Sequence, residues 1–368
     1  MRVEQVETVA YALPFAEPYA TARGTLEHRE MVLLRLRADD GREGLGEAVP
    51  LSLRGDSSLT EVEKALADTV SRLVGLDLDG AAEDPLGFAV ATLLELTATR
   101  RLGLAASAAL ECAVFDLTAK AVGEPLWRFL KAPDAQPVEC NATLTSGRPE
   151  AVARQAEAWA GTGFTTFKLK LGTDADDVAT VASVREAVGP EAAIRVDANE
   201  SWSVHDAVAV LSAIDQHGIE LAEQPVAGLR AMARVARDVE IPLAADEAVS
   251  SEADAHRAVQ RHSCEYATAK LSKVGGLGAA RMIAGVLPTY LSSALDGPVG
   301  IAAAAHAAQV LRGDGNDPEI AHGLATQRLF AESVATRECT LSDGSLHLPE
   351  GPGLGVELDE GALERFAI

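Results

Sequence analysis

From residue 138 onward the chain repeats one pattern, a short apolar run followed by a stretch rich in Ala, Glu and Arg. The apolar runs are "VECNATL", "FTTFKLKLG", "AAIRVDANE", "IELAEQP", "IPLAADEA", "YATAKLS" and "PTYLSSAL". Their centres recur about every 22–27 residues, the length of one β-strand plus one α-helix. Seven such units, with a further strand expected near "EIAHGLA", predict an α/β fold with a (β/α)7β-type, TIM-like barrel over residues 126–333.

The alternative architecture is an open, doubly wound sheet, which carries a GxGxxG turn after its first strand when it binds dinucleotides. No such motif follows an early strand of this sequence. The stretch "VGGLGAA" at residues 274–280 does follow a strand-like run, but its glycine spacing differs from that of the motif. The barrel therefore remains the prediction.

Both ends of the chain follow a different pattern. The segments "RVEQVETVAYAL" and "EMVLLRLRADDGREGLGEAV" predict antiparallel strands with a hairpin, and two helical stretches follow them. The tail, from "CTLSDGSLHLP" onward, consists of short strand-like runs and Gly/Pro turns. We therefore predict an α+β capping domain built from residues 1–125, to which the C-terminal segment 334–368 returns.

The amino-acid composition limits the classes of partner that we expect for this chain. The 368 residues carry a formal net charge of −23, which argues against nucleic acid and anionic membrane as partners but permits a small anionic substrate. The four cysteines are scattered without a paired spacing, as in a protein with reduced thiols. The first residues do not resemble a signal peptide, and the longest apolar run is too short to span a bilayer. We expect a cytoplasmic protein.

Polar residues close five successive strand-like runs. In chain order they are Lys170, Asp197, Glu223, Asp246 and Lys270, at gaps of 27, 26, 23 and 24 residues. In a barrel such positions meet at the C-terminal mouth, where active sites lie. Three converging carboxylates repel one another unless a cation holds them, and oxygen ligands suit Mg²⁺, with Mn²⁺ as a substitute. The row predicts a metal site, whereas any single acid at a strand end is more often a helix cap.

The pair Lys168 and Lys170 in "GFTTFKLKLG" needs an explanation, because residues i and i+2 of a strand point the same way. Buried lysines are costly unless other groups compensate their charge. A frayed edge strand is one explanation, and a polar active-site mouth is the other. A lysine that removes protons must be neutral part of the time, so we expect burial, Lys168 and the cation to lower the pKa of Lys170.

Five motifs resemble the enolase superfamily, specifically its muconate-lactonizing enzyme subgroup: "KLK" at 168–170, "DAN" at 197–199, "EQP" at 223–225, "DE" at 246–247 and "AKLSKVGG" at 269–276. The resemblance covers nearly the whole chain, including "GPGLGVEL" in the tail. It implies removal of a proton next to a carboxylate, with the enolate stabilised by Mg²⁺. It also implies that the three acids of the row bind the metal and that its two lysines face each other across the substrate.

The same resemblance implies supporting roles for three neighbours. Lys168 would lower the pKa of Lys170 or contact a substrate carboxylate. Asn199 and Glu247 would orient the groups that act on metal or substrate. The alternatives for this last pair are an asparagine that serves only its turn and a solvated glutamate.

Three stretches bear on the substrate. "LSSALDGPVGIAAAAHAA", with Ser292 and Ser293 as candidate substrate contacts, and "AHGLATQRLFAESVA" resemble o-succinylbenzoate synthases. "PFAEPYATARGTLEHREMVLLRL" resembles their opening loop, in which Arg23 would suit a dicarboxylate or would be a solvated loop residue. Dipeptide epimerases usually carry Asp-x-Asp at the eighth strand to hold the substrate ammonium, and this segment has none. Glu47 in "GLGEAVPL" is typical of the family, with no role evident from the sequence.

These resemblances predict an o-succinylbenzoate synthase, a carbon–oxygen lyase that dehydrates 2-succinyl-6-hydroxy-2,4-cyclohexadiene-1-carboxylate in menaquinone biosynthesis. Lys170 would remove the proton, and Lys270 would stay an ammonium that stabilises the enolate. The alternatives are an N-acylamino acid racemase or dipeptide epimerase, in which both lysines exchange protons, a muconate cycloisomerase, and a barrel that binds without catalysis. We expect a small carboxylate as substrate and a homo-oligomer as the assembly.

Overall fold

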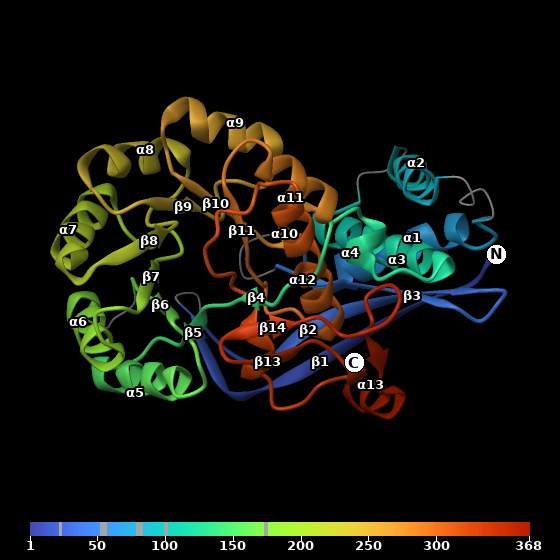
Figure 1. Ribbon diagram of the computed structural model, residues 1–368, viewed down its shortest axis with the longest axis horizontal. Helices are drawn as coiled ribbons and strands as arrows, with labels where there is room; N and C mark the ends of the chain where they lie inside the picture. Colours follow the sequence, from blue (N-terminus) through green and yellow to red (C-terminus); the bar gives the residue numbers. More distant parts are fainter. Residues whose placement is uncertain (22–23, 52–56, 79–83, 99–101, 173–175) are drawn as a thin grey trace.

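The computed structural model describes residues 1–21, 24–51, 57–78, 84–98, 102–172 and 176–368 (Figure 1). A ring of strands surrounded by helices lies beside a smaller unit, in which helices pack on a three-stranded sheet. Across these described ranges, no helix is long and apolar enough to cross a membrane.

The smaller unit is an antiparallel sheet of order β1-β2-β3 covered by helices. Its strands are β1 (Val3–Thr21), β2 (Gly24–Ala38) and β3 (Glu43–Ala48). Its helices are α1 (Leu59–Leu73), α2 (Pro85–Ala98), α3 (Leu104–Val122) and α4 (Leu126–Phe129). The predicted hairpin and both predicted helices are present. Helix α1 begins at a capping box in which Ser58 and Glu61 bond each other's backbone amides.

Helix α3 packs unusually close to β3, and two glycines make this approach feasible. A Cβ at Gly46 would lie 1.9 Å from the carbonyl oxygen of Ala109, and one at Gly44 would lie 2.3 Å from that of Ala113. Alanines on the facing side of α3 complete the fit. The "GLG" of the "GLGEAVPL" motif is therefore a packing requirement, because larger residues would push the helix off the sheet.

The larger unit is a parallel sheet of seven strands in the order β11-β10-β9-β8-β7-β6-β5, with helices outside it (Figure 1). The strands are β5 (Ala142–Leu144), β6 (Thr166–Lys170), β7 (Ala193–Asp197), β8 (Ile219–Glu223), β9 (Leu243–Ala245), β10 (Tyr266–Ala269) and β11 (Thr289–Leu291). The helices between and after them are α5 (Pro149–Ala160), α6 (Asp177–Val188), α7 (Val204–Ile214), α8 (Leu229–Asp238), α9 (Glu252–Arg261), α10 (Leu271–Val274), α11 (Leu277–Ala284) and α12 (Pro298–Gly313). Each strand lies within one of the predicted apolar runs.

Residues 321–323 close the ring. The amide of His322 donates to the carbonyl of Glu139 at 2.7 Å, and the amide of Asn141 returns a bond to the carbonyl of His322 at 2.8 Å. On the other side, the amide of Gly323 donates to the carbonyl of Leu291 at 2.8 Å. This segment bridges the first and last strands at the place where the sequence predicts an eighth strand, within "EIAHGLA".

The C-terminal tail returns to the smaller unit, as predicted. It comprises β12 (Ala335–Arg337), β13 (Thr340–Ser342), β14 (Ser345–His347), β15 (Glu357–Leu358) and α13 (Glu360–Phe366). Tyr11 of β1 forms a bridge with Ala367, and β14 pairs with β4 (Val138–Glu139) at the start of the barrel. The predicted fold class, a capping domain plus a TIM-like barrel, is confirmed. The boundaries of the segments 1–125, 126–333 and 334–368 stay a prediction.

His306 joins barrel, cap and tail from inside α12. Its Nδ1 accepts the amide of Trp127 at 3.1 Å, so the proton sits on Nε2, which faces the carbonyl of Leu354 at 3.3 Å. The ring is 1% exposed, and burial lowers the pKa of His306 to about 4. Between pH 6.5 and about 4, His306 is therefore protonated in the unfolded chain and neutral in the folded chain.

This difference predicts a loss of stability on acidification. Because the pKa of His306 is lower in the folded state, its contribution is complete above pH 6.5 and is lost as the pH falls toward 4, by at most about 3 kcal/mol. His306→Asn, which keeps an acceptor for Trp127, should flatten the dependence of the free energy of unfolding on pH in this window. Urea unfolding at pH 7, 6, 5 and 4.5 measures it, and the exposed His205→Asn is the control. An unchanged slope in His306→Asn would contradict the assignment.

Candidate active site

Five consecutive strands gather the five predicted residues at their carboxyl ends. Lys170, the last residue of β6, is in register with Asp197 at the end of β7, which is in register with Glu223 at the end of β8. Asp246 and Lys270 directly follow the last residues of β9 and β10. We call these five residues, three acids with a lysine at either end, the carboxylate row. The strand repeat alone brings them to one mouth of the ring.

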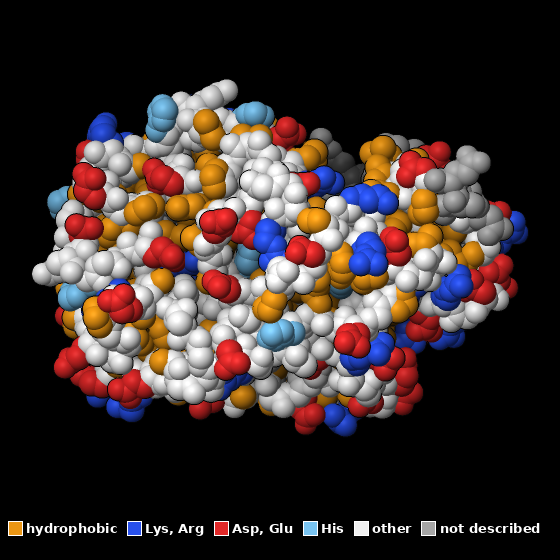
Figure 2. Space-filling model, viewed as in Figure 1, with side chains coloured by type: hydrophobic (Ala, Val, Ile, Leu, Met, Phe, Trp, Pro, Cys, Tyr) orange, Lys and Arg blue, Asp and Glu red, His pale blue; other side chains and the backbone are white. Residues whose placement is uncertain are grey.

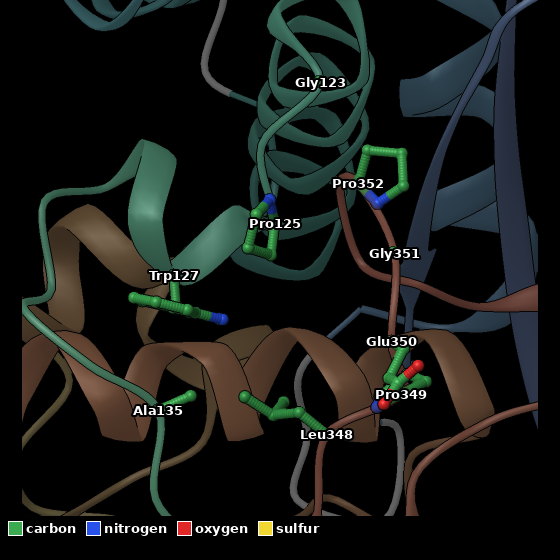
Figure 3. A pocket seen from close by; sticks show the side chains of 9 residues that line it. All are labelled: Gly123, Pro125, Trp127, Ala135, Leu348, Pro349, Glu350, Gly351 and Pro352. Carbon is green, nitrogen blue, oxygen red and sulfur yellow. The ribbon is translucent and has the colours of Figure 1, made fainter.

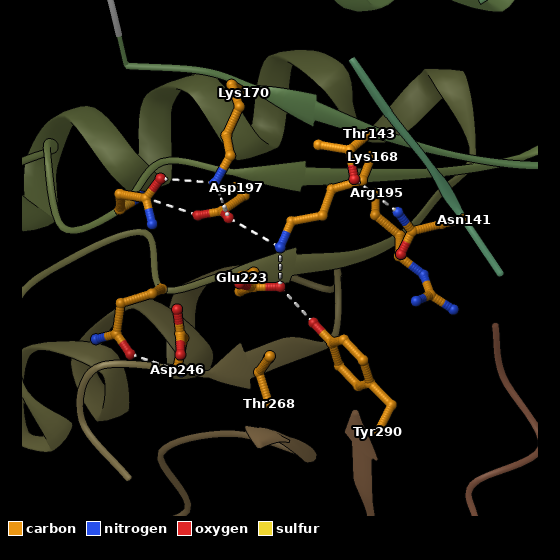
Figure 4. Close-up of polar contacts among 12 residues, drawn as sticks. Asn141, Thr143, Lys168, Lys170, Arg195, Asp197, Glu223, Asp246, Thr268 and Tyr290 are labelled. Carbon is orange, nitrogen blue, oxygen red and sulfur yellow. Dashed lines mark hydrogen bonds and ion pairs between the residues drawn. The ribbon is translucent and has the colours of Figure 1, made fainter. Parts of the chain in front are cut away.

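Lys168 lies between two carboxylates of the row (Figure 4). Its ammonium donates to Glu223 Oε2 at 2.6 Å and pairs with Asp197 Oδ2 at 2.9 Å. The Lys170 ammonium binds the same Asp197 oxygen at 2.6 Å. Because both carboxylate side chains are fully buried, these contacts offset the cost of removing the charges from water. The two lysines of "KLK" are therefore tolerated because acids of the next two strands face them.

The same contacts shift pKa values. Burial raises the pKa of Asp197, but Lys168 and Lys170 outweigh burial and hold this pKa well below its usual range. Burial lowers the pKa of Lys170, and Lys168 lowers it further, but the attraction of Asp197 leaves it raised. The sequence does not reveal that Asp197 contacts the ammonium directly, and this contact outweighs the lowering by burial and Lys168. A lowered pKa for Lys170 with the cation bound stays a prediction.

Asn199 and Glu247 extend the contacts of Lys170. Asn199 Oδ1 accepts from the Lys170 ammonium at 2.9 Å, and its Nδ2 donates to Glu247 Oε1 at 3.1 Å. The Asn199 backbone has φ 45°, a left-handed conformation that asparagine adopts more readily than most residues. The structure brings this predicted pair to Lys170, while their roles in the reaction stay a prediction.

Asp246 is held by two lysines, one of which the sequence reasoning missed. Lys270 donates to Asp246 Oδ2, as its place in the row suggests. Lys273 donates to Asp246 Oδ1 at 2.8 Å and to two backbone carbonyls. Gln224 supports the same turn by accepting the amide of Asp246 at 2.9 Å. The spacing of Lys270 and Lys273, one helical turn apart in "AKLSK", is the signal that indicates a shared partner.

The predicted substrate contacts lie beside the row, where the ring closes. Ser292 forms a bridge with Gly323, and Ser293 donates its hydroxyl to Asp296 Oδ2 at 2.7 Å. The amide of Ala294 donates to the same carboxylate oxygen at 2.6 Å. The Asp296 carboxylate thus accepts hydrogen bonds from within its own turn. Arg23 lies outside the described residues.

Glu47, whose role is not evident from the sequence, fastens the cap to this part of the barrel. Its carboxylate accepts the Tyr11 hydroxyl at 2.6 Å and the amide of Gly297, just before α12, at 2.7 Å. Burial and the nearby Asp296 raise the pKa of Glu47 to about 7. A side chain from β3 therefore fixes the start of the helix that follows Ser293.

Two buried polar residues beneath the row were also missed. Arg195 of β7 is 0% exposed and donates from Nη1 to the carbonyl of Ala321 at 2.5 Å. Its guanidinium lies 5.1 Å from the centre of the Tyr290 ring, and the Tyr290 hydroxyl donates to Glu223 Oε2 (Figure 4). Arg195 precedes Asp197 by two residues, so "RVD" puts both side chains on one face of the strand, as "KLK" does for the lysines.

A hollow lies away from the carboxylate row. It is bounded by the turn before α4 and by the tail, with Pro125, Trp127, Leu348, Pro349 and Pro352 among its lining residues (Figure 3). None of its lining residues belongs to the carboxylate row. On the face seen in Figure 2, acidic side chains are scattered with lysines and arginines between them. The buried acids and lysines at the strand ends are thus grouped more tightly than the charges on this face.

Two family models match the chain. Residues 3–130 match the N-terminal domain of mandelate racemase / muconate lactonizing enzymes, and residues 151–362 match the enolase C-terminal domain-like model. The chain belongs to the mandelate racemase / muconate lactonizing enzyme subgroup of the enolase superfamily. Together the matches cover most of the cap and the barrel strands from β6 to β11. The family resemblance seen in the sequence is confirmed.

Two characterised relatives show the range of the subgroup. The chain is 30% identical to the L-Ala-D/L-Glu epimerase of Bacillus subtilis (strain 168), over 97% of each chain. It is 31% identical to muconate cycloisomerase 1-2 of Acinetobacter lwoffii, over 100% of this chain and 95% of the relative. These relatives are isomerases, whereas the sequence favoured a synthase of the lyase class.

Solved structures agree in fold. The substrate-liganded L-Ala-D/L-Glu epimerase from Bacillus subtilis superposes with a TM-score of 0.87 at 29% identity, covering 97% of this chain and 99% of the other. The dipeptide epimerase from Enterococcus faecalis V583, in complex with Mg and the dipeptide L-Leu-L-Tyr, gives 0.87 at 27% identity, covering 97% and 100%. This superfamily member is thus an enzyme of the kind that abstracts a proton next to a carboxylate, and structural relatives bind Mg.

The donor chemistry of the row fits a divalent cation. Its three acids supply only carboxylate oxygens, the ligands that Mg²⁺ prefers, and Glu223 Oε1 is buried without a hydrogen-bond partner among the described residues. Within the same described ranges, no three acids, histidines or cysteines are gathered closely enough to hold a metal, and each acid of the row contacts a lysine instead. Mg²⁺ binding by Asp197, Glu223 and Asp246 therefore requires some of these ammonium contacts to loosen.

Glu223→Gln tests the metal assignment. The change keeps the shape of the side chain and removes one negative charge, so the affinity for Mg²⁺ should fall at least about tenfold. Isothermal titration calorimetry without substrate measures it, and the exposed Glu191→Gln is the matched control. Unchanged Mg²⁺ affinity in a folded Glu223→Gln protein would remove Glu223 from the ligand set.

Proposed function

We propose that this enzyme interconverts the two configurations of a carbon next to a carboxylate, as an N-acylamino acid racemase or a dipeptide epimerase. One observation carries the proposal, the placement of Lys170 and Lys270. In the ring of seven strands and the closing segment, β6 and β10 are the second and sixth members. They lie four steps apart in a ring of eight, so the two lysines extend from opposite walls.

Each lysine is bonded to an outer acid of the row, Lys170 to Asp197 and Lys270 to Asp246. In the reaction, a neutral lysine on one wall takes the α-proton, the C–H bond breaks, and the electron pair spreads into the substrate carboxylate as an enolate. The ammonium on the opposite wall then gives a proton to the other face of the same carbon. A bound divalent cation supplies positive charge that stabilises the enolate. No atom is gained or lost by the substrate.

The comparisons support this proposal, because the Bacillus subtilis relative is an epimerase and the Enterococcus faecalis structure holds a dipeptide. The closing segment favours the N-acylated substrate over the dipeptide. A dipeptide presents an ammonium group that needs an acid nearby. No Asp or Glu occurs between Ala321 and Phe330, and Asp296 is engaged within its own turn.

The lack of an acid in the closing segment also favours a second candidate, the o-succinylbenzoate synthase suggested by "LSSALDGPVG" and "AHGLATQRLF". Its substrate carries two carboxylates and no ammonium. Here Lys170 would remove the α-proton, and the resulting ammonium would return it to the departing hydroxyl, so that the C–O bond breaks and water leaves. Lys270 would stay protonated and stabilise the enolate by its charge. A cytoplasmic location and a homo-oligomeric state remain part of both proposals.

Proton exchange in D₂O separates the candidates. A racemase should wash solvent deuterium into the α-position of both enantiomers of N-acylamino acids, at one lysine for each enantiomer. Lys170→Ala should then lose exchange of one enantiomer, and Lys270→Ala that of the other, each by about 10²–10⁴-fold. NMR follows the exchange, and the exposed Lys64→Ala is the control.

The synthase predicts another pattern. Only the succinyl-cyclohexadiene substrate would be turned over, Lys170→Ala would lose α-proton exchange altogether, and Lys270→Ala would lose turnover. A panel that adds dipeptides and muconate covers the activities of the named relatives. If wild-type enzyme with Mg²⁺ neither exchanged an α-proton of any of these compounds nor turned any of them over, both candidates would be wrong.

A further inference from the structure

The two oxygens of Glu223 have unequal surroundings. Oε2 accepts two hydrogen bonds, from the Lys168 ammonium at 2.6 Å and from the Tyr290 hydroxyl at 2.5 Å. Oε1 is buried and accepts none from the described residues. A buried carboxylate oxygen without a donor is costly, so the arrangement makes sense if another positive group meets that oxygen.

Tyr290 is firmly held where it stands. It lies in the centre of β11 and is 0% exposed. The Arg195 guanidinium covers its ring at 5.1 Å, and Arg195 is itself fixed by Glu220 and by the carbonyl of Ala321. The hydroxyl of Tyr290 therefore reaches Glu223 of β8 from β11, three places along the sheet on one side, whereas Lys168 reaches it from β6, two places along on the other side. Figure 4 shows the two donors approaching one oxygen from different directions.

We propose that Tyr290 is a positioning residue that holds Glu223 Oε2 and so leaves Oε1 for the divalent cation. The proposal rests on the metal site of the proposed function. Lys168 alone is a weaker restraint, because its ammonium is shared with Asp197 Oδ2 at 2.9 Å and a single donor lets a carboxylate turn about its terminal bond. Two donors from two strands fix the plane of the carboxylate.

A neutral hydroxyl suits this task. A further ammonium would add positive charge beside the cation and repel it, whereas a phenol donates one hydrogen bond and brings no net charge. The position has no other evident use for a polar group, since a phenylalanine would fill the same apolar space beneath Arg195. The hydroxyl is thus the part of the side chain that the proposal assigns to the metal site.

The test is Tyr290→Phe, which removes the hydroxyl and keeps the ring under Arg195. Affinity for Mn²⁺, measured by the loss of the free-ion EPR signal without substrate, should fall about 10–100-fold. In assays, the Mg²⁺ concentration for half-maximal rate should rise by a similar factor, while kcat at saturating Mg²⁺ stays within about threefold. General damage to the fold would lower kcat as well. Tyr266→Phe, on the adjacent β10, is the matched control.

Three further results decide the matter. In a Glu223→Gln background, Tyr290→Phe should change Mn²⁺ affinity less than twofold, because the group it positions is already altered. If Glu223→Gln and Asp197→Asn bind Mn²⁺ like the wild type, the metal site of the proposed function fails. If those two variants lose Mn²⁺ but Tyr290→Phe binds it within twofold of the wild type, only the role of Tyr290 is overturned. Should Tyr290→Phe not fold, Tyr290→Met gives the same measurement without a donor.

Discussion

The shared contact of Lys168 with Asp197 and Glu223 is the interaction on which the site depends. Two carboxylates and an ammonium lie out of water at the ends of neighbouring strands. If one partner were removed, an uncompensated buried charge would remain, which is far more destabilising than the intact group. The charges therefore constrain one another, and the strand register that aligns them becomes part of the chemistry. On either side of this group, Lys170 contacts Asp197, and Lys270 and Lys273 contact Asp246.

The fold determines the positions of these charged residues. Seven parallel strands and the segment at residues 321–323 form the ring, and helices outside it leave the strand ends as a common mouth. The cap then fixes the part of the mouth that the row does not occupy. Glu47 reaches from β3 to the start of α12, and the close packing of α3 on β3 through Gly44 and Gly46 holds that strand in place.

The sequence predicted the architecture because a strand-plus-helix repeat has one length and every strand ends on the same side. It predicted the row for the same reason. It missed Arg195 and Tyr290, since their roles depend on contacts with elements that are distant in the chain. It also missed Lys273, although the spacing from Lys270 is a signal for a shared partner. It also missed one influence on the pKa of Lys170, because burial and Lys168 are evident from "KLK" while the contact with Asp197, which raises this pKa, is not. In "PTYLSSAL", Tyr290 reads as an ordinary aromatic residue of a strand. Only the structure shows that its hydroxyl donates to Glu223.

Different parts of the ring contribute to the reaction and to the recognition of the substrate. Removal of an α-proton needs only the row and its lysines, so racemases, cycloisomerases and dehydrating lyases can share that part of the barrel. What they do not share is the group that recognises the rest of the substrate. In this chain the closing segment presents Ala321, His322 and Gly323, and His322 is turned toward Leu291 and Asp317. The proposed function therefore assigns this wall a substrate whose far end is an acylated nitrogen or a carboxylate, because the segment from Ala321 to Phe330 offers no acid to an ammonium. The reaction class then follows from that substrate, because the same enolate either receives a proton on its other face or expels a hydroxyl.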